Sequence, residues 1–248
     1  MIQTRRLSKN FGQLIAVEAL DLSVHAGEFF AFLGPNAAGK TTTIKMLVGL
    51  LKPTSGHVEI GGFDMQRQPE RAKALMSYVP DFPFLYDKLT AHEFMRFVGE
   101  IYQLDRRAIV QRTGELFEKF HLHDYAHELT ENLSHGTRQR LVIASALLHE
   151  PKILVIDEPM VGLDPHHARI VKEEFRERAE AGMTIFLSTH QLSVAEEIAD
   201  RIAIIHRGKL IALGSVDELR REAREQGPLE QVFLALVDAE EALHGQRE

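Results

Sequence analysis

The stretch FFAFLGPNAAGKTTTIKML, residues 29–47, decides the fold, because it reads as a strand, a phosphate loop and a helix in direct succession. FFAFL is apolar throughout, as expected of a strand buried on both faces of a parallel sheet. GPNAAGKT (34–41) fits the pattern Gly-x-x-x-x-Gly-Lys-Ser/Thr. Apolar residues at helical spacing follow the loop, namely Ile44, Leu47, Val48 and Leu51. This context predicts a phosphate-binding loop rather than a plain Gly-rich turn.

The loop supplies the first set of candidate ligand residues. They are Gly34, Pro35, Asn36, Ala37, Ala38, Gly39, Lys40, Thr41 and Thr42. We expect the backbone N–H groups that the loop offers, all but that of Pro35, to surround phosphate oxygens, Lys40 to reach the terminal phosphates, and the Thr41 hydroxyl to bind Mg²⁺. The sequence thus predicts a nucleotide and Mg²⁺ at this turn.

Further apolar runs resemble the strand ahead of the loop. They are ILVID (153–157), TIFLS (184–188) and IAII (202–205), with helical patterns between them. Alternating strands and helices predict an α/β protein with a mostly parallel core sheet. Residues 2–25 and the run HVEI (57–60) predict an additional antiparallel β subdomain at the N-terminal side.

Residues 86–149 interrupt this alternation with helical patterns alone. HEFMRFVGEIYQL, RAIVQRTGELFEKF and RLVIASALL predict a helical subdomain inserted into the core. After residue 216, DELRREAREQ predicts a charged helix, and LEQVFLALVD predicts a short amphipathic helix that packs back on the body. The predicted division is one domain over residues 1–220, insertion included, followed by a helical tail over 221–248.

Composition limits the class of protein. The 248 residues carry a net charge of −7, are 44% apolar and contain no Cys. The lack of a long apolar run predicts that the chain neither spans a membrane nor is exported. The lack of Cys excludes disulfides and fits a reducing cytoplasm. The negative charge argues against a surface devoted to nucleic acid.

Polar residues end two of the apolar runs. In ILVIDEP, Asp157 would hold Mg²⁺ through its water shell, and Glu158 is placed to orient and deprotonate an attacking water. In TIFLSTH, His190 at the strand tip is a candidate for contact with the γ-phosphate and the water, and a structural role, the more common one for a lone His, is the alternative. Phe11, ahead of the phosphate loop, is a candidate for stacking on adenine, and core packing is an almost equal alternative.

A second phosphate-binding feature lies in LSHGTRQR (133–140). Ser134 precedes a helical pattern as a good cap, and such a helix start can hold an anion. In order, the chain carries KNFG, GPNAAGKT, YVPD, LSHGTRQR, ILVIDEP, VGLDP and STH. Over about residues 1–220 this succession resembles the ATP-binding cassette ATPases, the nucleotide-binding subunits of ABC transporters. The Ser-x-Gly segment ahead of the Asp–Glu strand is the specific part of the resemblance.

The resemblance implies a RecA-like P-loop NTPase core, ATP and Mg²⁺ as cofactors, and a head-to-tail dimer of two cassettes. In that dimer Ser134 and Gly136 would contact the γ-phosphate bound by the partner's loop, and residues 162–164 would run along the interface. Glu158 would activate water, and His190 would stabilise the transferring phosphoryl group. The complete set of site residues is consistent with two identical copies.

Three positions depart from the family pattern. Ala37 stands where the family often has Gly, which is tolerable if the φ angle is negative. His135 replaces the usual second-position Gly of the signature, while the flanking Ser and Gly are kept. Asp81 follows SYVP in place of the usual Gln. We expect Asp81 to contact Mg²⁺, directly or through water, with a role as a turn former ahead of Pro83 as the alternative.

PDFPFLYDKLT and the tail LEQVFLALV resemble a branch that works with separately encoded permeases of the ABC-2 exporter kind. Residues 82–86 would be the docking site of such a permease or the inner face of the helical subdomain. The resemblance therefore implies an exporter ATPase, cytoplasmic and peripheral on the inner face of the membrane, with no nucleic acid partner. A soluble ABC ATPase of the cofactor-assembly type is the alternative. No residue identifies the cargo.

Overall fold

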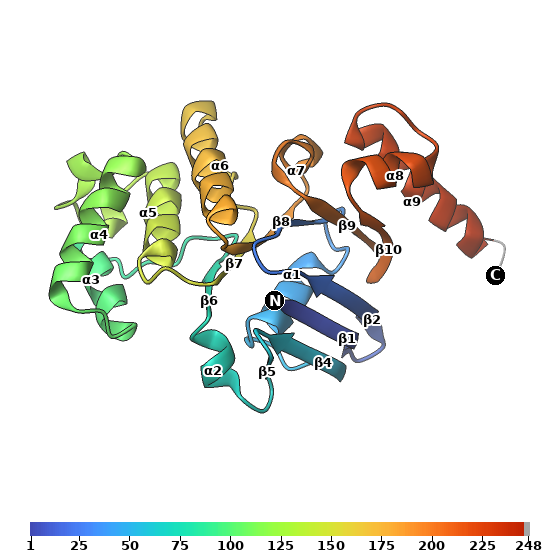
Figure 1. The fold of residues 1–248 in the computed structure, drawn as a ribbon, viewed down its shortest axis with the longest axis horizontal. Coiled ribbons are helices and arrows are strands. Elements are labelled where there is room, and N and C mark those ends of the chain that lie inside the picture. The colour runs from blue at the N-terminus through green and yellow to red at the C-terminus, as the bar shows by residue number, and fades with distance from the viewer. Residues whose placement is uncertain (246–248) are drawn as a thin grey trace.

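The computed structural model describes residues 1–245, so residues 246–248 of the predicted tail lie outside it. It contains a larger core sheet and a smaller N-terminal sheet. In Figure 1 the N-terminal sheet lies below the core, the inserted helices lie at the left, and the C-terminal helices lie at the right. The predicted α/β class, with an antiparallel β subdomain and a helical insertion, is confirmed.

The core sheet is mostly parallel. Its strands are β3 (Phe29–Leu33), β6 (Met76–Val79), β7 (Ile153–Asp157), β8 (Thr184–Thr189), β9 (Arg201–His206) and β10 (Lys209–Gly214). They lie in the order β10-β9-β3-β8-β7-β6, and only β10 is antiparallel to its neighbour. The four predicted apolar runs form β3, β7, β8 and β9. The two edge strands, β6 and β10, were not predicted.

The N-terminal sheet is antiparallel, as predicted. Its strands are β1 (Ile2–Phe11), β2 (Leu14–Val24), β4 (Ser55–Ile60) and β5 (Phe63–Asp64), in the order β2-β1-β4-β5. Gly12 lies in the turn between β1 and β2 with a φ of +61°, a conformation that glycine adopts without a Cβ clash. Ile2 and Leu7 of β1 are fully buried, which anchors this sheet to the core.

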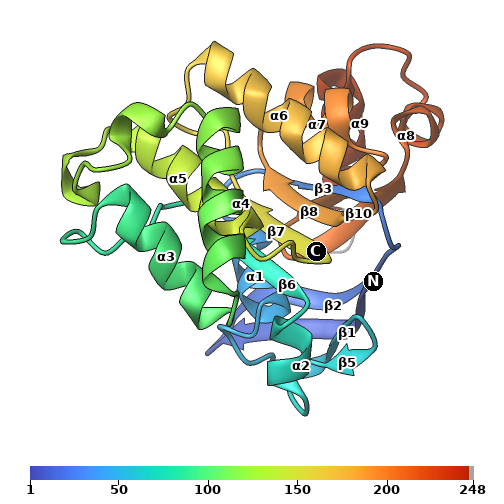
Figure 2. The same cartoon turned by 60° about the vertical axis from the view of Figure 1, so that its left-hand side comes forward.

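Helix α1 (Lys40–Leu47) lies between the two sheets, as Figure 2 shows. It is shorter than the predicted apolar spacing, which ran to Leu51. Ile44 and Leu47 are fully buried and pack in one cluster with Phe186 of the core sheet. Because buried apolar area contributes roughly 25 cal/mol per Å², this packing fixes the helix and the loop ahead of it.

The predicted insertion consists of helices. They are α3 (Ala91–Ile101), α4 (Arg106–Lys119) and α5 (His135–Leu147), with single 3₁₀ turns at His123–Tyr125 and Thr130–Asn132. Local side chains define where the helices begin. Thr90 Oγ1 accepts the N–H of Glu93 at 3.2 Å, and the Glu93 carboxylate accepts the N–H of Thr90 at 2.9 Å, so α3 begins with a capping box. Asp105 caps α4 in a similar way.

The remaining helices lie outside the insertion. They are α2 (Pro69–Lys73), α6 (Pro165–Glu180), α7 (Leu192–Ile198), α8 (Val216–Ala223) and α9 (Leu229–Gly245). The predicted domain limit at residue 220 falls inside α8. Helix α9 is longer than predicted, and its Leu229 and Val232 are fully buried in a cluster with Ile202 of β9. Within residues 1–245, no helix is both long enough and apolar enough to cross a membrane.

Candidate functional site

The strands that precede the predicted site residues end at one edge of the core sheet. Leu33 of β3 pairs with Thr189 of β8, and Asp157 of β7 pairs with Ser188 of β8. Because these strands are parallel, the loops that follow them lie side by side at their carboxyl ends, where α/β sheets bind ligands. The sheet therefore brings together the phosphate loop, the Asp–Glu pair and the loop that carries His190.

The phosphate loop approaches its neighbours so closely that two positions admit only glycine. A Cβ on Gly34 would lie 2.4 Å from the carbonyl oxygen of Ile205, and one on Gly39 would lie 2.5 Å from that of Ala16. Gly39 also has a φ of +108° and precedes α1, whose first turn has no side-chain cap. The uncapped N–H groups suit an anion. Lys40 Nζ donates a hydrogen bond of 2.7 Å to the Gly34 carbonyl.

Ala37 does not meet the condition of a negative φ under which an alanine is tolerable at its position. Its φ is +64°, in the left-handed region, where a Cβ costs roughly 1–2 kcal/mol. The exposed Ala37 side chain lies on the loop next to Ala38, which is buried and has no positive φ. The alanine is therefore strained at this position, and the strain is stored in the loop itself.

The Asp157 carboxylate is the buried anion of the site. Asp157 is 1% exposed, and its Oδ2 accepts a hydrogen bond of 2.9 Å from Thr41 Oγ1. Within the described residues, Oδ1 has no hydrogen-bond partner. Burial raises the pKa of Asp157, the hydroxyls of Ser188 and Thr41 lower it, and the charges of Asp81 and Glu158 raise it further. An unpaired carboxylate oxygen beside a hydroxyl fits the oxygen ligands that Mg²⁺ prefers.

Glu158 connects the loops that follow β3 and β8. Its Oε1 lies 2.8 Å from His190 Nδ1 and 4.0 Å from Lys40 Nζ, and its Oε2 accepts a hydrogen bond of 3.0 Å from Thr189 Oγ1. Burial lowers the pKa of Lys40, and the carboxylates of Glu158 and Asp157 raise it. Glu158 has a φ of +50°, and such backbone strain in a residue other than glycine is concentrated at functional sites.

A cavity of about 590 Å³ joins these groups. The phosphate loop, Asp157 and Glu158 line it together with Phe11. The Phe11 side chain is 49% exposed, and Lys9 Nζ lies 5.2 Å from its ring centre. The ring therefore faces the cavity and solvent, which favours the ligand-stacking interpretation over core packing.

The cavity has further lining residues, some of them predicted from the sequence and others not. Asp81 lines it, and its Oδ1 also accepts the N–H of Phe82 at 3.0 Å, so the metal role and the turn role are compatible. Ile15 and Arg207 line it but were not predicted. No motif marks either residue. The sequence offers one indication for Arg207, which is the turn HRGK directly after the buried run IAII.

The signature segment lies outside this cavity. Ser134 caps α5, and its Oγ accepts the N–H of Thr137 at 3.2 Å. Ser134 is exposed at the surface, and neither Ser134 nor Gly136 lines the described cavity. The fold therefore does not bring the signature and the phosphate loop together within one chain.

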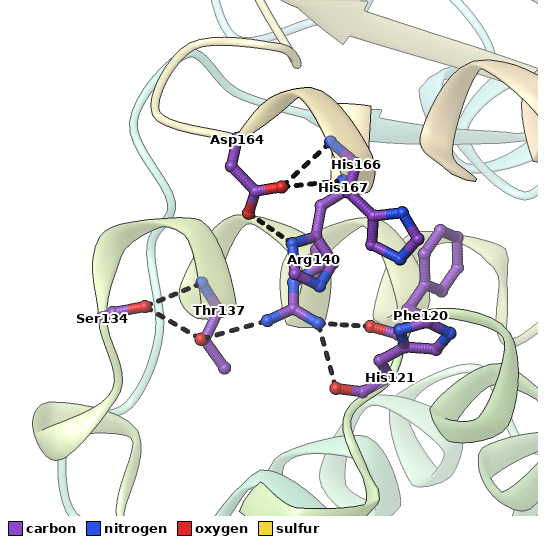
Figure 3. Close-up of polar contacts among 8 residues, drawn as sticks. All are labelled: Phe120, His121, Ser134, Thr137, Arg140, Asp164, His166 and His167. Carbon is purple, nitrogen blue, oxygen red and sulfur yellow. Dashed lines mark hydrogen bonds and ion pairs between the residues drawn. The ribbon is translucent and has the colours of Figure 1, made fainter. Parts of the chain in front are cut away.

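The signature packs against the loop that follows β7. A Cβ on Gly136 would lie 2.9 Å from the Gly162 carbonyl oxygen, and a Cβ on Gly162 would lie 2.1 Å from the His135 ring. The His135 ring thus occupies space that only a glycine at 162 leaves open. Asp164 then begins α6, because its Oδ1 accepts the N–H of His167 at 3.1 Å (Figure 3).

Comparison with known proteins decides the family. The family model described as ABC transporter matches residues 17–161, more than half of the chain. The chain belongs to the ABC transporter family. The family predicted from the sequence, with ATP as its nucleotide, is therefore confirmed.

Two curated members of the ABC transporter family are similar over most of this chain. The "Probable multidrug ABC transporter ATP-binding protein YbhF" of Escherichia coli is 38% identical over 96% of the chain, which covers 42% of YbhF. The "Nod factor export ATP-binding protein I" of Cupriavidus metallidurans is 36% identical over 88% of the chain and 72% of its own length. The chain thus spans less than half of YbhF.

A solved structure agrees with these relatives. An ATP-binding subunit of an ABC transporter has a TM-score of 0.91 to this chain at 32% identity, and the match covers 96% of this chain and 99% of that one. The ABC cassette fold therefore extends over nearly the whole chain.

An exposed aromatic patch lies between β6 and α3. It consists of Phe82, Phe84 and Tyr86. Their side chains are 68%, 81% and 57% exposed, whereas Leu85 between them is buried in the core of the helical subdomain. The Tyr86 ring lies edge-on to Phe97 at 5.0 Å. Leu85 therefore faces inward, as expected for the inner face of the helical subdomain. The aromatic patch faces outward, as expected for a docking surface.

Proposed function

We propose that the chain is the ATP-hydrolysing subunit of an ABC exporter and powers separately encoded permease subunits. The observation that carries this proposal is the convergence of Lys40 and Glu158 beside the buried Asp157 at one cavity, with His190 hydrogen-bonded to Glu158 next to it. The names of the relatives, which are ATP-binding proteins for transport and export, point to the same function.

The chemistry follows from the positions of these residues. Lys40 and the loop N–H groups hold the β- and γ-phosphates, and Phe11 stacks on adenine. Glu158, held by Thr189 and His190, accepts a proton from the attacking water. A bond then forms between the water oxygen and the γ-phosphorus, the bridging P–O bond breaks, and ADP departs. His190, hydrogen-bonded to Glu158 through Nδ1, stabilises the transferring phosphoryl group, so positioning and charge supply most of the catalysis.

The same residues would hold Mg²⁺. Thr41 would supply its hydroxyl, Asp157 would act through a water, and Asp81, which lines the same cavity, would join them. The support for this assignment is the buried, unpaired Oδ1 of Asp157. When bound, the ion offsets the phosphate charge.

The functional unit would be a head-to-tail dimer of two identical copies. The support is the position of Ser134, exposed at the start of α5 and outside the cavity of its own chain. In the dimer, Ser134 and Gly136 of one copy contact the γ-phosphate held by the phosphate loop of the other. ATP then holds the dimer together, and hydrolysis releases it.

The permease would dock on the aromatic patch. Phe82, Phe84 and Tyr86 form an exposed apolar surface of the kind that protein interfaces use. The chain would therefore lie on the cytoplasmic face of the membrane, bound through the permease and not through lipid. Export as the direction of transport is supported by the Nod factor export relative.

The first test is Glu158→Gln, which keeps the shape of the side chain and removes the base. We expect ATP binding to persist and the hydrolysis rate to fall at least about 10²-fold, because a positioned general base contributes 10²–10⁴ in rate. Because the bound ATP is not hydrolysed, the dimer should accumulate, and light scattering measures it directly.

A matched control is Glu180→Gln, an exposed position at the end of α6. It should leave both hydrolysis and dimerisation unchanged. A Glu158→Gln protein that hydrolyses ATP at the normal rate would remove Glu158 from the mechanism. One that stays monomeric at saturating ATP would contradict the dimer.

A further inference from the structure

A buried arginine is linked to the signature serine through Thr137. Arg140 of α5 is 5% exposed, and its Nη1 donates hydrogen bonds to the carbonyls of Phe120 at 2.5 Å and His121 at 2.9 Å. Its Nη2 donates to Thr137 Oγ1 at 3.3 Å. Figure 3 shows this guanidinium between the end of α4 and the start of α5.

The end of α4 explains why the cation is stable there. Helix α4 ends at Lys119, so the carbonyls of Phe120 and His121 lie just past the negative end of the helix dipole. His121 has a φ of +52°, which turns the chain away from the helix. Burial lowers the pKa of Arg140, and the nearby groups Tyr125 and Asp164 raise it. Nη1 and Nη2 therefore exchange water for carbonyl and hydroxyl oxygens, whereas Nε has no partner within the described residues.

The hydrogen bonds from Arg140 have a fixed direction. A guanidinium only donates, so Thr137 Oγ1 is an acceptor toward Arg140. Thr137 Oγ1 also lies 2.9 Å from Ser134 Oγ, and Thr137 is 3% exposed. Distance alone leaves the donor of this pair open, and the direction in which Thr137 donates to Ser134 Oγ is the one that gives the buried Thr137 proton a partner. Ser134 Oγ then accepts both the O–H and the N–H of Thr137, which leaves its own proton to be donated outward.

The geometry points to Arg140 and Thr137 as positioning residues, which set the direction of the Ser134 hydroxyl so that it donates to the γ-phosphate held by the partner copy. This inference rests on the proposed dimer. The hydroxyl is then oriented before the nucleotide arrives, and no reorientation is needed when the two copies meet.

The test measures ATP-dependent dimerisation in the Glu158→Gln background, where no ATP is consumed. Ser134→Ala should raise the dissociation constant of the dimer about a hundredfold, because each of two sites loses a hydrogen bond to a charged group, about tenfold apiece. Thr137→Val, which keeps the shape and removes the hydroxyl, should raise it about tenfold. Thr137→Ser should restore dimerisation to within about twofold of the parent.

A double-mutant cycle between Ser134 and Thr137 distinguishes a positioning role of Thr137 from simple support of the fold. In the double variant Ser134→Ala/Thr137→Val, the dissociation constant should equal that of Ser134→Ala alone, because Thr137 acts through the serine hydroxyl. Thr113→Val is the matched control. Thr113 of α4 is 2% exposed, and within the described residues its hydroxyl has no partner, so dimerisation should not change.

Each outcome decides a different point. If Thr137→Val weakens the Ser134→Ala dimer as much as it weakens the parent, Thr137 merely supports the helix and the inference fails. The inference also fails if Thr137→Val has no effect while Ser134→Ala does, although the proposed dimer then stands. If Ser134→Ala itself leaves dimerisation unchanged, the proposed contact between Ser134 and the partner's ATP is contradicted, and so is the inference that depends on it.

Discussion

Ala37 combines a left-handed backbone with a side chain that carries a Cβ. Replacing it by Gly should raise the free energy of unfolding by up to about 1 kcal/mol, since the relieved strain of roughly 1–2 kcal/mol exceeds the entropy that Gly adds to the unfolded chain. Urea unfolding followed by circular dichroism measures this difference.

Replacing the neighbouring residue, Ala38, by Gly should change the free energy of unfolding in the opposite direction. Ala38 is 3% exposed and has no positive φ, so Ala38→Gly should lower the free energy of unfolding by about 1 kcal/mol. If both substitutions destabilise the protein to the same extent, the strain assigned to Ala37 is absent.

Residues that belong to a motif were predictable one by one. Lys40 and Thr41 follow from the loop pattern, and Glu158 and His190 follow from their places after buried runs. The φ of Ala37 was not predictable, because the sequence does not fix a backbone angle that its neighbours impose. Arg207 was not predictable either, since its place in the cavity depends on the pairing of β9 with β10.

At the scale of elements, the C-terminal helix is held by one face. Leu229 is fully buried against the body, whereas Leu234 of the same helix is 54% exposed. Leu229→Ala should therefore lower the free energy of unfolding by about 3 kcal/mol, while Leu234→Ala changes it by less than about 0.5 kcal/mol. Equal effects of the two substitutions in urea unfolding would show that α9 does not pack as described.

Elements were predictable where their apolar pattern is complete. The fully buried strands β3, β7 and β8 were all identified, because a continuous apolar run leaves few alternatives. Strand β6 has four residues, and β10 is largely half-buried, so neither presents such a run. Both lie at the edges of the sheet, and their place depends on partners far away in the sequence.

At the scale of the whole molecule, the exposed Ser134 stands apart from the phosphate loop of its own chain. Under the proposed dimer, each ATP site takes Lys40 from one copy and Ser134 from the other. A lesion in either residue therefore damages both sites of a homodimer, although the two lesions lie on opposite halves of each site.

This separation has a genetic consequence. An allele with Lys40→Met and an allele with Ser134→Ala would each encode a protein without an intact site. In a mixed pair, however, one site carries both lesions and the other carries none. Coexpression should therefore restore about a quarter of normal ATP hydrolysis, since half the pairs are mixed and each has one good site. A purified pool as inactive as either parent would argue against complementation between the two alleles.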